Sequence, residues 1–135
     1  MVQKHTGGGY LDKQQALHQF WSGFKLKAYD ENTVPDNALS ANGNKYLTYN
    51  VSTAALDEPT PIYANLWYKS TAWDEISQKA NEISEAISRG GVVIPVDGGY
   101  IWICRGVPFA QRMADDDPQI RRIYLNCMAE YLSVD

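Results

Sequence analysis

Apolar residues follow a helical spacing near the start of the chain. They recur every three or four positions, on what would be one side of a helix, as Leu17, Phe20, Trp21 and Phe24. Asp12 precedes this stripe and can form a capping box with Gln15, while Gly23 is suited to the end of the helix. The pattern therefore predicts a short helix that packs by one apolar face.

A second and longer helical pattern begins near residue 70. Its apolar positions step by three and four along the chain: Trp73, Ile76, Ala80, Ile83 and Ile87. Ser70 or Thr71 can cap the start, and Asp74 suits the positive end of the helix dipole. Arg89 suits the opposite end, and the glycines at 90–91 stop the helix.

Between and after these helices the pattern becomes that of β-strands. Segments rich in β-branched and aromatic residues predict strands at residues 46–51, 62–68, 92–96, 100–104 and 119–132. Turn residues between strands, at 57–61 and 97–99, indicate hairpins. Alternate residues of two strands share one face: Ile62, Ala64, Leu66 and Tyr68 in one, and Ile123, Leu125, Cys127, Ala129 and Tyr131 in the other. We therefore expect an α+β fold, with a mainly antiparallel sheet of about five strands and two helices packed on one face.

The chain has 135 residues and a mass of 15.2 kDa, which suits one domain. We expect this domain to span residues 11–135. Residues 1–10 are polar and glycine-rich and indicate a flexible N-terminal arm. Residues 25–45 are polar and predict a long surface loop, and residues 105–118 predict a second connection.

Composition and charge narrow the range of functions expected for this chain. With 12 Lys and Arg against 16 Asp and Glu, the net charge is −4, which disfavours a nucleic-acid coat because phosphate binding needs a basic surface. No run of about 18 apolar residues is present, as a membrane-spanning helix needs. Two cysteines are too few for a secreted disulfide framework, so we expect a reduced, cytosolic protein. Aromatic residues reach 12%, and such residues fill cores and favour interfaces.

No motif for catalysis, for a metal or for a cofactor stands out. His18 has no partner motif, and Cys104 and Cys127 lie in strands, where free cysteine usually behaves as a small apolar residue. The run Asp115–Asp117 lacks the alternating ligands of a calcium loop, so a solvated loop is expected there. We therefore expect no enzyme activity, with a small metal-dependent hydrolase that uses Asp115–Asp117 as the alternative.

The last third of the chain holds a candidate interaction surface. It combines arginines, acidic residues and apolar residues: Arg105, Phe109, Arg112, Met113, Asp115, Asp116, Asp117, Arg121 and Arg122. One interpretation is a set of exposed salt bridges within the chain, each of little value to stability. The other is an interface in which arginines of one copy bind the aspartates of the next, because a guanidinium grips a carboxylate with two hydrogen bonds.

The residues of this region resemble a known family. The stretch 102–113, WICRGVPFAQRM, an acidic run, and then 120–126, IRRIYLN, are similar to the C-terminal half of small head–tail joining proteins of long-tailed bacteriophages. The greatest resemblance is to the tail terminator family, also labelled tail completion or minor capsid proteins. The order of elements upstream also resembles this family. The likeness covers most of the chain except residues 1–10 and 25–45.

This resemblance implies a structural role without catalysis. Tail terminators form a ring, typically of six copies, at the head-proximal end of the tail tube, where the ring ends tube growth and presents a surface to the neck of the capsid. The implied partners are other copies of the chain, the tail tube protein and a neck protein. DNA would pass through the lumen without specific binding, and no membrane is involved. The protein would be assembled in the bacterial cytoplasm and reside in the virion.

Two other roles stay open beside this one. A head-completion or stopper protein would have a similar composition but would bind the portal side of the neck instead of the tube. A peptide-binding module would use an open sheet edge to add a strand from its partner.

Overall fold

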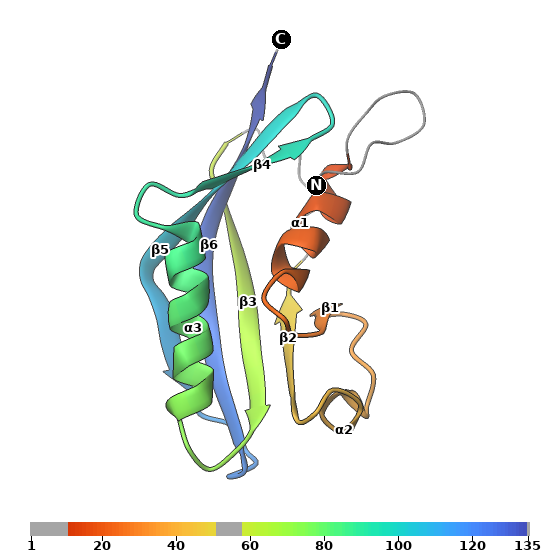
Figure 1. Ribbon diagram of the computed structural model, residues 1–135, viewed down its shortest axis with the longest axis vertical. Helices are drawn as coiled ribbons and strands as arrows, with labels where there is room; N and C mark the ends of the chain where they lie inside the picture. The colour runs from red at the N-terminus through yellow and green to blue at the C-terminus, as the bar shows by residue number, and fades with distance from the viewer. Residues whose placement is uncertain (1–10, 51–57, 135) are drawn as a thin grey trace.

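A computed structural model describes residues 11–50 and 58–134 (Figure 1). The described helices are α1 (Lys13–Ser22), α2 (Ala38–Ala41) and α3 (Asp74–Ile87). The described strands are β1 (Ala28–Asp30), β2 (Lys45–Tyr49), β3 (Thr60–Lys69), β4 (Val92–Val96), β5 (Gly99–Met113) and β6 (Ile120–Ser133). None of the helices in these segments is long and apolar enough to cross a membrane.

The strands form one sheet in the order β1-β2-β3-β6-β5-β4. Its centre is the antiparallel pair β3 and β6, in which Leu66 lies opposite Ile123. β2 runs antiparallel to β3, and β4 forms a hairpin with β5, as the turn residues predict. Figure 1 shows α1 and α3 in front of the same face of the sheet, so the expected two-layer arrangement is confirmed for these helices.

The segment between residues 25 and 45 differs from the predicted surface loop. It contains β1, which runs parallel to β2, and the short helix α2. The sheet is therefore mixed and six-stranded, not antiparallel with five strands. Leu26, Ala28 and Ala38 are buried, and they are the few apolar anchors in an otherwise polar stretch. Their number is too small for a periodic pattern, which explains why the sequence predicts a loop here.

The predicted connection after residue 104 is also largely strand. β5 continues to Met113, with an irregular register between Arg105 and Ala110 where a β-bulge interrupts its pairing with β6. Gly106 lies in this bulge, and a Cβ there would be 2.3 Å from the side-chain nitrogen of Asn126. Glycine and proline in this stretch therefore belong to a bulge inside a strand, where both residues are common.

The core lies between the sheet and the two longer helices. The apolar seam of α3 is confirmed, because Ile76, Ala80, Ile83 and Ile87 are all buried. The sheet contributes the predicted faces of β3 and β6, of which Tyr131 is only half-buried: Ile62, Ala64, Leu66, Tyr68, Ile123, Leu125, Cys127, Ala129 and Tyr131. The alternation of apolar and polar residues in the sequence therefore predicts correctly which face of these strands is buried.

The ends of the helices are partly as expected. The Asp12 carboxylate accepts a hydrogen bond from the Gln15 backbone N–H at 2.8 Å, and the Gln15 side-chain oxygen accepts one from the Asp12 backbone N–H at 3.2 Å. The capping box of α1 is therefore confirmed. Gly23 is the C-cap of α1. The prediction that Ser70 or Thr71 caps α3 is wrong: Trp73 is the N-cap and has no side-chain cap bond. The Ser70 hydroxyl instead accepts a hydrogen bond from the Ala72 N–H at 3.0 Å, before the helix begins.

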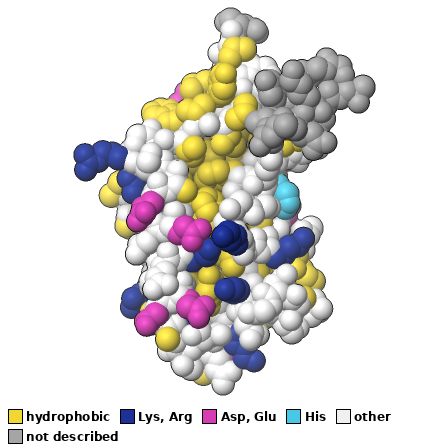
Figure 2. Space-filling view, viewed as in Figure 1, with side chains coloured by type: hydrophobic (Ala, Val, Ile, Leu, Met, Phe, Trp, Pro, Cys, Tyr) yellow, Lys and Arg dark blue, Asp and Glu magenta, His cyan; other side chains and the backbone are white. Residues whose placement is uncertain are grey.

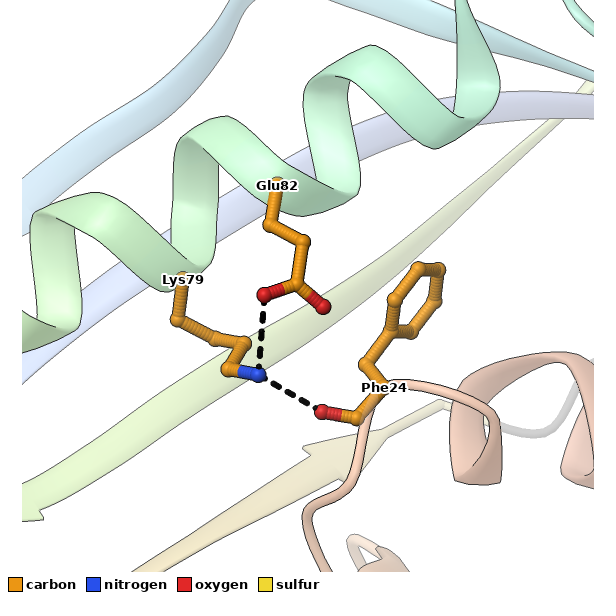
Figure 3. A network of polar contacts seen from close by, with 3 residues as sticks. All are labelled: Phe24, Lys79 and Glu82. Carbon is orange, nitrogen blue, oxygen red and sulfur yellow. Dashed lines mark hydrogen bonds and ion pairs between the residues drawn. The ribbon is translucent and has the colours of Figure 1, made fainter.

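One polar network ties α3 to the segment that follows α1 (Figure 3). The Lys79 ammonium donates to the Phe24 carbonyl at 2.8 Å and forms an ion pair with Glu82 at 3.1 Å. Lys79 is half-buried while Glu82 is exposed. The hydrogen bond to Phe24 therefore holds two elements together that are distant in the sequence.

Replacement of Lys79 by methionine tests this network. We expect Lys79→Met to lower the free energy of unfolding by about 1–2 kcal/mol, because the Phe24 carbonyl loses its charged donor in a half-buried place. Glu82→Gln, which weakens only an exposed ion pair, should change it by less than about 0.5 kcal/mol. Urea denaturation measures both values, and equal effects of the two substitutions would contradict the assignment.

Candidate functional site

The structure distributes the predicted interaction residues over three places. Arg105, Phe109, Arg112 and Met113 lie on β5, the aspartates 115–117 lie in the turn to β6, and Arg121 and Arg122 lie at the start of β6. Phe109 and Met113 are therefore strand residues and not part of a loop as expected. Phe109 is half-buried against the core, whereas Met113 is exposed.

Two of the arginines flank one tryptophan. The guanidinium carbons of Arg112 and Arg121 lie 4.7 Å and 5.3 Å from the ring centroid of Trp73. Arg121 also donates to the carbonyls of Thr71 at 2.8 Å and Pro118 at 2.9 Å. Cation–π attraction and these bonds tie the start of β6 to the start of α3. Arg121 therefore has a role in holding the fold.

Arg122 points to the face of the sheet opposite α1 and α3. Its guanidinium lies 5.0 Å from the ring centroid of Trp67, and its Nε donates to the Asn65 side chain at 2.9 Å. Tyr46 stacks on the same tryptophan at 6.1 Å between ring centroids. This arginine is thus part of an aromatic cluster and is separated by the sheet from Arg105.

Arg105 lies beside α3, where its Nη1 donates to the Ser84 hydroxyl at 2.8 Å. It lines an open pocket of about 340 Å³ together with Arg89, Gly106, Val107, Pro108 and Phe109. None of these lining residues is acidic. The pocket therefore combines two positive charges with apolar walls. Arg89 was predicted only as a partner for the helix dipole, so sequence reasoning missed its place here.

The acidic run forms an exposed turn between β5 and β6. Asp115 accepts the backbone N–H of Asp117 at 2.9 Å, and Asp117 accepts that of Gln119 at 2.9 Å. These bonds fix the shape of the turn. The negative charge of Asp115 also contributes, after burial, to raising the pKa of Tyr46.

Within the described segments the arginines and the aspartates do not meet. Lys79–Glu82 is the ion pair found there, and none joins an arginine to Asp115, Asp116 or Asp117. Internal salt bridges of the kind that one interpretation expects are therefore not formed in this part of the chain. The carboxylates of the turn and the guanidinium groups of Arg89 and Arg105 keep their charges available to a partner.

A second surface emerges only from the fold. Five exposed apolar residues lie on the face of the sheet opposite α1 and α3, near the starts of β4 and β5 and the end of β6: Val93, Tyr100, Trp102, Leu132 and Val134. Strand pairing brings them together, because Trp102 lies opposite Val93 and Tyr100 opposite Leu132. We call this group the apolar corner. Contiguous exposed apolar surface is typical of interaction sites.

The helical face has a different character. Figure 2 shows charged side chains of both signs over α3, whereas apolar side chains gather over β4 and in the region between α1 and α3. Ile94 of β4 and Phe20 of α1 are half-buried and pack against the core. They therefore extend the core towards the surface.

The two cysteines lie on neighbouring strands but on opposite faces. Cys104 is opposite Met128 and Cys127 is opposite Arg105, so their side chains point to different sides of the sheet. Both are free thiols. Burial raises the pKa of Cys127 to about 12, with a smaller effect of Cys104, and burial together with Glu130 raises the pKa of Cys104.

These pKa shifts predict how the thiols react with iodoacetamide. A raised pKa lowers the fraction of reactive thiolate at pH 8. We expect half-buried Cys104 to be alkylated slowly and Cys127 not at all while the protein is folded, with both reacting at similar rates in urea. Peptide mass spectrometry locates the label. Alkylation of Cys127 before Cys104 in the native protein would contradict the placement.

The described residues contain no set of metal ligands of the kind that the hydrolase alternative needs. Among residues 11–50 and 58–134, no group of three or more His, Cys, Asp or Glu side chains is arranged to hold a metal ion. In the acidic turn, Asp115 and Asp117 are engaged with backbone N–H groups instead.

The fold is similar to that of a chain from a solved assembly described as the virion of a native gene transfer agent (GTA) particle. The likeness covers 89% of this chain and 94% of the other, with a TM-score of 0.58 and 17% sequence identity. At that identity the comparison concerns the fold alone. No protein family model matches the sequence, and no curated protein sequence matches it.

Proposed function

We propose that this chain is a structural protein of a phage-like virion and that it acts as a tail terminator. In this role, copies form a ring, of six in the expected case, at the head-proximal end of the tail tube. The ring ends growth of the tube and joins the tail to the neck of the capsid. The proposal is supported chiefly by the fold likeness to a chain of a GTA virion, which extends over nearly the whole of both chains.

Two surfaces support a role in assembly. The apolar corner leaves large side chains exposed, with Val93 at 51% and Trp102 at 38%, and their burial against a partner would be favourable. The acidic turn and the Arg89–Arg105 pocket leave opposite charges unpaired on one chain. A ring built head to tail needs two different, complementary surfaces on each copy, and this chain offers such a pair.

The partners follow from the role. They are other copies of the chain, the tail tube protein on one side and a neck protein on the other. DNA passes through the lumen and is not bound specifically, in agreement with a net charge of −4. The proposed site of action is the virion, after assembly in the host cytoplasm, and residues 11–135 would act as one domain.

Sedimentation velocity and electron microscopy of the purified protein, alone and mixed with tail tube protein, test this proposal. We expect closed rings in at least the second case. Val93→Glu should weaken association, because it places a charge in the apolar corner. Gln78→Glu adds the same charge at an exposed position of α3 and is the control. Monomers under all conditions would overturn the proposal.

A binding assay decides which side of the neck the protein occupies. Immobilised protein should retain tail tube protein and not portal protein. Retention of portal protein alone would replace the tail terminator by a head-completion or stopper protein. Particles that lack the chain should have tails of uncontrolled length that are not joined to heads, and correct tails in its absence would contradict the proposed role.

A further inference from the structure

The pocket beside the bulge of β5 has the features of a carboxylate-binding site. Arg105 enters it from β5 and Arg89 from the connection between α3 and β4. Its volume is about 340 Å³, and it is open to solvent. Val107, 96% exposed, lies at its rim. An incoming side chain can therefore displace water and contact apolar walls at the same time.

The two arginines of the pocket have N–H groups that are available to bind an anion. Arg105 uses one nitrogen, Nη1, to donate to Ser84, which orients the guanidinium while other N–H groups stay available. Arg89 is exposed and forms no hydrogen bond or ion pair with the described residues. Two like charges that line one pocket without a carboxylate create a positive potential, and a negative ligand relieves it.

The acidic turn has the matching features of a ligand. All of its residues from Ala114 to Gln119 are exposed, and hydrogen bonds from Asp117 and Gln119 to aspartate side chains stiffen it. Asp116 carries no hydrogen bond or ion pair with the described residues. A ligand whose shape is fixed in advance loses little conformational entropy on binding.

The turn and the pocket of one molecule are too far apart to meet. β5 runs from Arg105 to the turn after Met113. Because of the bulge, this stretch pairs with β6 only from Cys127 to Arg122, and these five steps span roughly 17 Å at about 3.3 Å per residue. The turn lies beyond Met113 and leads back along β6. A carboxylate that reaches the pocket must therefore come from another molecule.

We propose that the pocket of Arg89 and Arg105 in one copy binds the acidic turn, led by Asp116, of the next copy. Guanidinium groups bind carboxylates through paired, charge-assisted hydrogen bonds. The contact joins two different surfaces, so it propagates from copy to copy and closes into a ring when the rotation allows it. This inference rests on the proposed self-assembly and identifies the residues that perform it. Arg112, Arg121 and Arg122 are not assigned as the carboxylate-binding groups, because each guanidinium lies over a tryptophan ring.

Charge reversal on each side tests the contact. Arg89→Glu and Asp116→Arg each place like charges across the interface and should weaken association at least tenfold in sedimentation velocity. Neither residue has a bond within the described part of its own chain, so both variants should fold, which circular dichroism checks. Lys27→Glu is the control for Arg89→Glu, since it makes the same change of charge at an exposed residue that lies in neither the pocket nor the turn.

Restoration of complementary charges provides the decisive measurement. The double variant Arg89→Glu/Asp116→Arg should associate nearly as well as the unchanged protein. An equimolar mixture of the two single variants should also associate, because each pocket then finds an opposite charge on the other variant. Association of the unchanged protein should weaken in 1 M salt, where charges are screened within about 3 Å.

The outcomes separate the two proposals. If the unchanged protein forms rings and the Arg89→Glu variant forms them equally well, the assigned contact is wrong while the assembly role stands. If the single variants fail and neither the double variant nor the mixture recovers, the contact is likewise wrong. If the unchanged protein stays monomeric with tube protein present, the assembly role itself fails.

Discussion

Replacement of Gly99 by alanine is expected to destabilise the protein by roughly 3 kcal/mol or more, at the upper end of the range for overpacking. A Cβ at this position would lie 2.0 Å from the carbonyl oxygen of Leu132 and 3.0 Å from its carbonyl carbon. These are backbone atoms of the neighbouring strand and cannot turn away. β5 and β6 would have to separate where Gly99 pairs with Ser133. Urea denaturation measures the loss of free energy of unfolding.

Gly90→Ala is the matched control for this prediction. A Cβ at Gly90 has no atom within 4 Å, and its backbone does not adopt a positive φ. We therefore expect a change within about 0.5 kcal/mol, as for surface substitutions in general. A similar loss of stability in both variants would show that the close approach of β5 and β6 does not constrain this position.

Trp21→Ala should have an effect of the same order, about 3–5 kcal/mol. Trp21 is the main anchor of α1, since only 1% of its surface is exposed. Its ring contacts Phe20 and Phe24 at 4.9 Å and 6.4 Å between centroids. Loss of the indole leaves a cavity that these neighbours fill only in part, and α1 loses its hold on the sheet. Chemical denaturation and a lower melting temperature report the effect.

Trp102→Ala removes the same side chain from a different environment. Trp102 is 38% exposed and donates one hydrogen bond, to the Gly90 carbonyl at 3.0 Å. We expect its replacement to cost about 1–3 kcal/mol, less than at Trp21, because one hydrogen bond and a smaller buried area are lost. The same variant should weaken association, because Trp102 belongs to the apolar corner. Equal loss of stability at Trp21 and Trp102 would contradict the assigned burial.

The periodic elements follow from the sequence. The stripe of α3 from Ile76 to Ile87 and the alternating face of β6 are read directly, because a repeated spacing of apolar residues occurs only where one side of an element is buried. Caps with their partner three residues away, such as Asp12 with Gln15, are equally local. For these elements, neighbours in the chain hold the information.

The irregular elements do not follow from the sequence pattern. β1 consists of three residues that pair with β2. Next to it, the Lys27 carbonyl accepts a hydrogen bond from the Leu47 N–H at 2.9 Å, a contact between residues twenty positions apart. The bulge of β5 resembles a loop in sequence because Gly106 and Pro108 occur in both. Tertiary pairing with β6 decides that the chain continues as a strand to Met113.

The candidate site shows the same division. The sequence by itself determined that arginines and aspartates crowd the last third of the chain, and it predicted the helices and the inner face of the sheet, since composition and spacing are local properties. Only the tertiary structure decided that Arg112 and Arg121 face Trp73, that Arg122 lies on the other side of the sheet, and that Arg89 joins Arg105 in a pocket. Strand register and the packing of α3 bring these residues together or apart, and both depend on contacts between segments that are far apart along the chain.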